Sequence, residues 1–84
     1  MYSILLSNRA EKQLDKFDNK QYQKIKIAIL TLKDNPRPFG CIKLTNQEGY
    51  RIRVGSYRIL FEIDDSEKNV KIYSVKHRKD AYRK

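Results

Sequence analysis

Hydrophobic and polar residues alternate most regularly between Tyr50 and Ile63, with one interruption at Gly55-Ser56. Alternation with a period of two is typical of half-buried strands, and glycine at the first of two linking positions favours a type II′ turn. The pattern therefore predicts a β-hairpin. Antiparallel pairing around this turn places six apolar side chains on one face of the hairpin: Tyr50, Ile52, Val54, Tyr57, Ile59 and Phe61.

The opposite face of the predicted hairpin carries arginines. In this register Arg53 lies opposite Arg58, and Arg51 lies two residues from Arg53 on the same face. Like charges directly opposite each other cost up to roughly 1 kcal/mol per pair, so their retention favours a surface that binds an anion. The alternative is an ordinary solvated face. On the anion-binding reading, the three guanidinium groups point outward and form one cationic patch.

Apolar residues before the hairpin recur with helical spacing. Ala10, Leu14 and Phe17 stand at i, i+4 and i+7 and predict an amphipathic helix, and Ser7-Asn8 supplies candidate N-caps for it. Asp18-Asn19 ends this pattern and can cap a second helix, which is predicted to run to about Lys33. The apolar stripe of the second helix consists of Tyr22, Ile25, Ala28, Ile29 and Leu32.

The remaining segments complete an α+β arrangement. Tyr2 to Leu6 and Val70 to Val75 are predicted strands, Ile42 to Leu44 a short extended piece, and the proline-containing segment 34–40 a loop. The predicted order is strand, helix, helix, strand, strand, strand. We therefore expect one domain over residues 1–84, with a small, mostly antiparallel sheet and an N-terminal helical hairpin packed on one face.

Composition narrows the class of partner. The chain has 19 Lys and Arg against 10 Asp and Glu, a formal net charge of +9, which favours nucleic acid, an acidic protein or an anionic membrane. We expect no membrane association, because no run approaches the roughly 20 apolar residues that span a bilayer. Residues 1–9 lack the features of a signal peptide, and the single Cys41 cannot form an internal disulfide; both predict a cytoplasmic protein.

The candidate site consists of cations with one titrating group. We expect no metal and no cofactor, because one His and one Cys give no ligand cluster and the chain contains no glycine-rich phosphate loop. Guanidinium groups suit a phosphodiester that gains charge during cleavage, and an RNA substrate supplies its own 2′-OH nucleophile. His77 would assist proton transfer and Tyr82 would stack on a base, although a lone histidine in a basic tail is often only a solvated surface residue. The predicted site is Arg51, Arg53, Arg58, His77, Arg78 and Tyr82.

Two segments of the sequence resemble a known superfamily. The segment from Glu48 to Asp64, which includes YRIRVGSYRILFEI, and the segment from Val75 to Tyr82, which includes HRKDAYR, are similar to those of the RelE/ParE toxins of type II toxin–antitoxin systems. The resemblance extends over the whole chain. It implies a cytoplasmic toxin, monomeric by itself, that forms a hetero-oligomer with a RelB-like antitoxin wrapped over its basic site.

The resemblance also implies roles for individual residues. A RelE-like toxin is a metal-independent endoribonuclease that cleaves mRNA in the ribosomal A site, and its pattern assigns a transition-state clamp to Arg58 and a proton donor to Arg78. Arg51 and Arg53 stand where the RelE pattern has lysines, and a guanidinium is a poor base, so electrostatic roles are expected for them. The alternatives are a ParE-like inhibitor of DNA gyrase, which needs no proton-transfer group, and a non-catalytic RNA-binding module.

Overall fold

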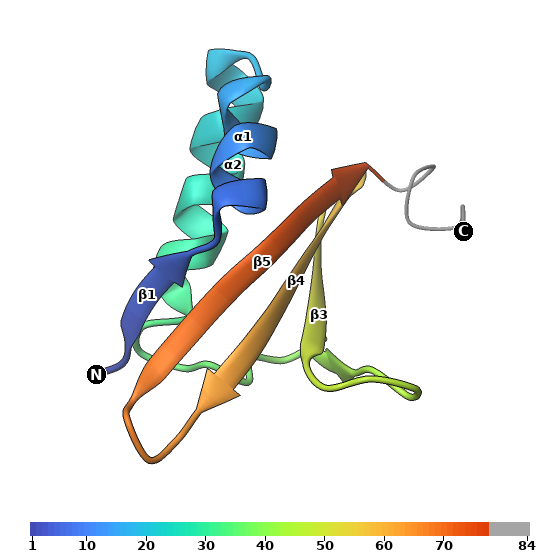
Figure 1. The fold of residues 1–84 in the computed structure, drawn as a ribbon. Coiled ribbons are helices and arrows are strands. Elements are labelled where there is room, and N and C mark those ends of the chain that lie inside the picture. Colours follow the sequence, from blue (N-terminus) through green and yellow to red (C-terminus); the bar gives the residue numbers. More distant parts are fainter. Residues whose placement is uncertain (78–84) are drawn as a thin grey trace.

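The computed structural model describes residues 1–77. Its elements are β1 (Ser3–Leu6), α1 (Asn8–Asp15), α2 (Asn19–Thr31), β2 (Ile42–Lys43), β3 (Tyr50–Val54), β4 (Tyr57–Asp64) and β5 (Asn69–His77). They form one sheet in the order β1-β5-β4-β3-β2 (Figure 1). β1 pairs with β5 in parallel, and the other pairs are antiparallel. The predicted α+β class with a mostly antiparallel sheet is confirmed.

Both helices begin at the residues that the sequence nominates as caps. The Ser7 hydroxyl accepts a hydrogen bond from the Ala10 N–H at 3.1 Å, and the Asp18 carboxylate accepts one from the Gln21 N–H at 2.9 Å. Each bond satisfies a donor that a helix start leaves without an intrahelical partner.

No helix within residues 1–77 has the length and apolar content needed to cross a membrane.

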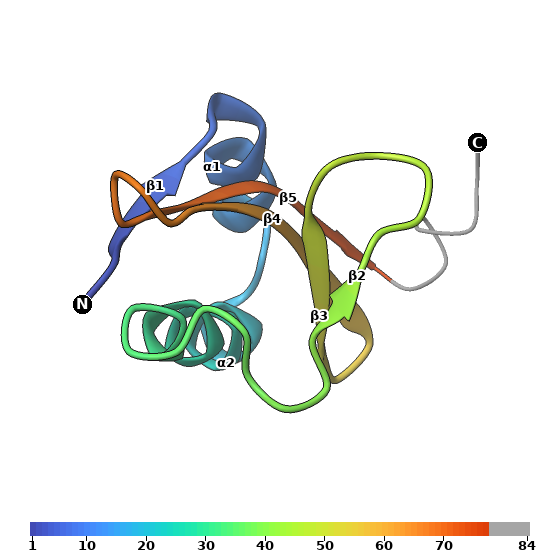
Figure 2. The ribbon, with the colours of Figure 1, turned by 90° about the horizontal axis from the view of Figure 1, so that it is seen from below.

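α2 and one face of the strongly twisted sheet, which we call the core face, form the hydrophobic core (Figure 2), and Ala10 and Leu14 of α1 also belong to it. The predicted apolar face of the hairpin is part of it, and Ile59 and Phe61 are fully buried there. α2 contributes Ile25, Ile29 and Leu32. Spacing of three and four residues puts these side chains on one side of the helix, which explains why α2 lies flat against the strands.

α1 takes the place of a neighbouring strand along part of β5. β1 pairs only with the first residues of β5, from Asn69 to Ile72. From Ile72 onwards the β5 backbone meets α1 and its N-cap: the Ser7 N–H donates to the Ile72 carbonyl at 2.9 Å, and the Val75 N–H donates to Gln13 Oε1 at 2.6 Å. These contacts satisfy backbone groups that an uncovered sheet edge would leave open.

The hairpin register is the predicted one at all five paired positions of β3, from Tyr50 opposite Phe61 to Val54 opposite Tyr57. Gly55 has φ +59°, which agrees with glycine at the first position of a type II′ turn. The pairing of β4 with β5 is less regular. Phe61 lies opposite Ile72 and Leu60 opposite Ser74, so Tyr73 is an extra residue, a β-bulge.

Candidate functional site

The face of the sheet opposite the core face carries the predicted arginines. We call it the outer face and define it by the polar positions of the hairpin and their neighbours on β4: Arg51, Arg53, Arg58, Leu60 and Glu62. Arg53 is exposed and Arg51 is half-buried. The structure shows no ion pair between either of these arginines and a carboxylate of residues 1–77. The predicted grouping of the three arginines on one face is therefore present in the register.

Arg58 corrects one part of the prediction, because it does not project into solvent. Only 5% of its surface is exposed. β4 has a neighbouring strand on each side, and Arg58 lies between Arg53 on β3 and Lys76 on β5. The aliphatic part of a long cationic side chain buries readily. Arg58 is thus a buried cation of the sheet, whereas Arg53 is an exposed one.

His77 occupies a different place from the one the sequence suggests. It pairs with Tyr57 on the neighbouring strand, and its ring meets the Tyr57 ring edge-on with centroids 5.2 Å apart. The Tyr57 ring in turn contacts Phe17, with centroids 4.7 Å apart. Because Tyr57 belongs to the core face, His77 lies on that side of β5, and the structure does not bring it together with Arg58.

The pairing of β4 with β5 adds to the site a residue, Lys76, that was not predicted from the sequence. Lys76 is half-buried and lies opposite Arg58. A signal for this was present in the sequence of β5: the aliphatic residues Val70 and Ile72 are two positions apart, but the next one, Val75, is three positions further on. Strict alternation would have continued at residue 74. The change of phase indicates an inserted residue, which exchanges the faces of all positions that follow.

The other two predicted site residues, Arg78 and Tyr82, lie outside the described part of the chain.

Within residues 1–77, no three His, Cys, Asp or Glu side chains come close enough together to hold a metal ion. Burial raises the pKa of the Cys41 thiol, which disfavours the thiolate and makes this cysteine a poor nucleophile.

Charge is distributed unequally along the outer face. A groove of about 650 Å³ lies at the end of the sheet nearest the β4–β5 turn. Its lining includes four carboxylates, from Glu48, Glu62, Asp64 and Asp65, and three cationic side chains, from Arg37, Lys43 and Lys71. The arginines at the β3–β4 turn do not line it. The outer face therefore has a mixed end, at the groove, and a cationic end, at Arg53 and Arg58. A phosphate is attracted to the cationic end.

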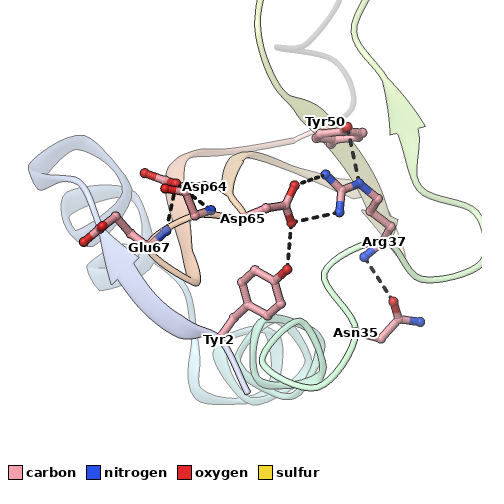
Figure 3. A network of polar contacts seen from close by, with 8 residues as sticks. Tyr2, Asn35, Arg37, Tyr50, Asp64, Asp65 and Glu67 are labelled. Carbon is pink, nitrogen blue, oxygen red and sulfur yellow. Dashed lines mark hydrogen bonds and ion pairs between the residues drawn. The ribbon is translucent and has the colours of Figure 1, made fainter.

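A polar network fixes the loop after α2 to the β4–β5 turn (Figure 3). Arg37 forms a bidentate ion pair with Asp65, with N–O distances of 3.2 and 2.9 Å, and lies 5.3 Å from the centre of the Tyr50 ring. The Tyr2 hydroxyl donates to the same carboxylate at 2.7 Å. Hydrogen bonds from Arg37 and Tyr2 lower the pKa of Asp65 to about 2. The network connects Tyr2, directly before β1, with the loop after α2 and the β4–β5 turn.

Replacing Asp65 with asparagine is expected to lower the melting temperature at pH 7 by about 1–4 °C, since exposed ion pairs contribute modestly. The depressed pKa makes this contribution pH-dependent. It is complete above the unfolded-state pKa of about 3.9 and declines as the pH falls towards 2, where the native carboxylate also becomes protonated. Thermal unfolding of both proteins between pH 7 and 2 should therefore show the difference closing. Glu67→Gln, which removes a carboxylate from the same turn, is the control for the change in net charge.

Comparisons with known proteins agree with this geometry. The family model described as the ParE toxin of the type II toxin–antitoxin system parDE matches residues 4–82. No curated protein sequence matches the chain.

Three solved structures illustrate the structural likeness. The RelE–RelB complex of the archaeon Pyrococcus horikoshii is 26% identical, with 92% of this chain and 94% of that chain covered and a TM-score of 0.80. The RelBE2 toxin–antitoxin complex of Mycobacterium tuberculosis is 25% identical, with coverage of 92% and 98% and a TM-score of 0.82. The YoeB dimer of Staphylococcus aureus is 27% identical, with coverage of 90% and 95% and a TM-score of 0.74.

Proposed function

The chain belongs to the ParE toxin family of type II toxin–antitoxin systems, and from this premise we propose that it is a metal-independent endoribonuclease that cleaves mRNA in the ribosomal A site. It is a toxin of the RelE/ParE superfamily. The observation that carries the nuclease proposal is the cationic end of the outer face, where Arg53 and Arg58 lie side by side on neighbouring strands. Similarity to RelE structures over 92% of the chain supports it.

The proposed reaction needs few groups from the protein. The 2′-OH of the substrate attacks the adjacent phosphorus atom, the bond to the 5′-oxygen breaks, and the phosphate gains negative charge in the transition state. Fixed donors aimed at such charge lower the barrier more than mobile ones, because they need no reorganisation during the reaction. The buried Arg58 suits this role, and Arg51 and Arg53 supply the surrounding positive potential.

Proton transfer is assigned differently from the sequence reading. His77 packs against Tyr57 on the core side of β5, so we no longer propose it as the proton-transfer group at the phosphate. Arg78 keeps the role that the family resemblance gives it, as donor to the leaving 5′-oxygen, and Tyr82 keeps the stacking role. The proposal places the toxin in the cytoplasm, where the translating ribosomes are.

One observation favours a second candidate, inhibition of DNA gyrase. The family model that matches residues 4–82 is that of ParE toxins, and an inhibitor of this type needs no proton-transfer residue. A position for His77 away from the arginines is compatible with it. The third reading, an RNA-binding module without catalysis, requires only the cationic outer face.

We also propose a cognate, RelB-like antitoxin as the physiological partner. Two of the similar structures are complexes of a toxin with its antitoxin. The protein carries a net charge of +9, so an antitoxin segment with acidic residues would be attracted to the outer face and would cover the cationic end. The toxin alone is proposed to be a monomer that forms a hetero-oligomer with its antitoxin.

The deciding experiment is induced expression without antitoxin, followed by mapping of 5′ ends on translated messages. The nuclease proposal expects growth arrest and new ends that follow the reading frame. In parallel, the purified protein is added to gyrase in a supercoiling assay. Inhibited supercoiling without new mRNA ends would identify the gyrase function instead, and normal growth would leave the RNA-binding module.

A further inference from the structure

Three cations lie in one row across neighbouring strands of the outer face. Arg53 on β3 is opposite Arg58 on β4, and Arg58 is opposite Lys76 on β5. Opposite residues on adjacent strands lie about 5 Å apart, so the row is about 10 Å wide from its first member to its last. Its two outer members are accessible: Arg53 is exposed and Lys76 is half-buried.

The bulge at Tyr73 is the reason that Lys76 belongs to this row. β4 and β5 pair in regular alternation from Asp64 opposite Asn69 to Phe61 opposite Ile72. Continued without the extra residue, the register would place Val75 opposite Arg58, and Lys76 would fall on the core face. With it, Val75 is buried to 2% exposure and Lys76 lies beside Arg58. Bulges commonly re-aim side chains next to functional sites.

From this geometry we propose that Lys76 is a substrate-binding residue that contacts a phosphodiester together with Arg53 and Arg58. The row places three cationic side chains beside one another at one end of the outer face. A phosphodiester is attracted to such a row, and an ammonium group at the end of a flexible chain is a suitable contact for it. The inference rests on the proposed function, in that it names a further residue of the same site.

The chain contains a matched comparison for Lys76. Lys71 lies on the same strand and on the same face, but its register partner is Glu62. Lys76→Gln and Lys71→Gln each remove one positive charge from the same face, so they change the net charge of the protein equally. A difference between them in RNA binding therefore reports the position of Lys76 beside Arg58.

Binding is measured with a 2′-O-methyl RNA oligonucleotide of ten residues, which cannot be cleaved by 2′-OH attack, over a range of salt concentrations. Lys76→Gln should weaken binding about 5- to 50-fold at low salt and lower the slope of log K against log salt by about 0.7, the amount expected for one lost phosphate contact on a single strand. Lys76→Arg should restore most of the affinity. Lys71→Gln should change neither the affinity nor the slope by a comparable amount.

Equal effects of Lys76→Gln and Lys71→Gln on binding would overturn the inference, because they would reflect net charge alone. So would a failure of the unsubstituted protein to bind the oligonucleotide, or unchanged binding by Lys76→Gln. These results are separable from the nuclease proposal. If the protein leaves translated messages intact but binds the oligonucleotide through Lys76, the inference stands and the nuclease proposal fails.

Discussion

Replacing Arg58 with alanine is expected to abolish growth inhibition and to lower the rate of cleavage of ribosome-bound mRNA by about 10²- to 10³-fold. Loss of one preorganised donor to a developing oxyanion has an effect of this size. Arg58 is the member of the cationic row that is held in place by burial, with 5% of its surface exposed, so it is the least able to be replaced by a neighbouring side chain. The measurement is 5′-end formation on translated messages, with purified toxin and ribosomes.

Controls must separate lost chemistry from lost folding, because Arg58 is buried. Circular dichroism and binding to the antitoxin report whether the variant folds. Arg53→Ala removes an exposed cation of the same row and should lower the cleavage rate without affecting folding. Arg9→Ala, on the exposed surface of α1, should have no effect. A folded Arg58→Ala protein that still arrests growth would contradict the role of the outer face.

Replacing Gly49 with alanine is expected to lower the free energy of unfolding by about 3–5 kcal/mol, through backbone strain together with a steric conflict. Gly49 has φ +114°, and a Cβ there would lie 2.8 Å from the Phe61 carbonyl oxygen and 3.1 Å from Tyr73 Oη. The carbonyl belongs to the backbone of β4, so it cannot move aside without disturbing the pairing of Tyr50 with Phe61. Denaturant unfolding measures the change.

Gly55→Ala provides the comparison for this prediction. Gly55 also has positive φ, at +59°, but a Cβ there meets nothing within 4 Å. Its cost is therefore expected to be backbone strain alone, about 1–2 kcal/mol. The difference between the two variants isolates the close approach of the chain at Gly49. Equal destabilisation would show that the contact with Phe61 and Tyr73 has no energetic weight.

The sequence predicted the parts of the fold that local chemistry determines. The register of β3 and β4 was predicted residue by residue, because a two-residue turn with glycine first leaves one way to pair the flanking strands. Ser7 and Asp18 were recognisable as caps for a similar reason: a short oxygen-bearing side chain directly before an amphipathic pattern has one good use.

The parts that escaped prediction depend on contacts between distant segments. The bulge at Tyr73 reversed the faces of Lys76 and His77, and a sequence in which both phases of β5 are apolar gave only a weak sign of it. The burial of Arg58 is a property of the assembled sheet, since an arginine at a polar position of an alternating pattern is expected to be exposed. The ion pair of Arg37 with Asp65 joins a loop to a turn, and many other pairings of charged residues were equally compatible with the sequence.

The parallel pairing of β1 with β5 has a consequence for the synthesis of this toxin. Ser3 lies opposite Asn69 and Leu6 opposite Ile72, so the first strand to be translated has no partner until the last one has been made. Contacts of such long sequence separation form late, because the intervening chain must first be ordered. Lys76 comes to lie beside Arg58 only when β5 pairs with β4. The complete cationic row can therefore form only after nearly all of residues 1–77 have been synthesised.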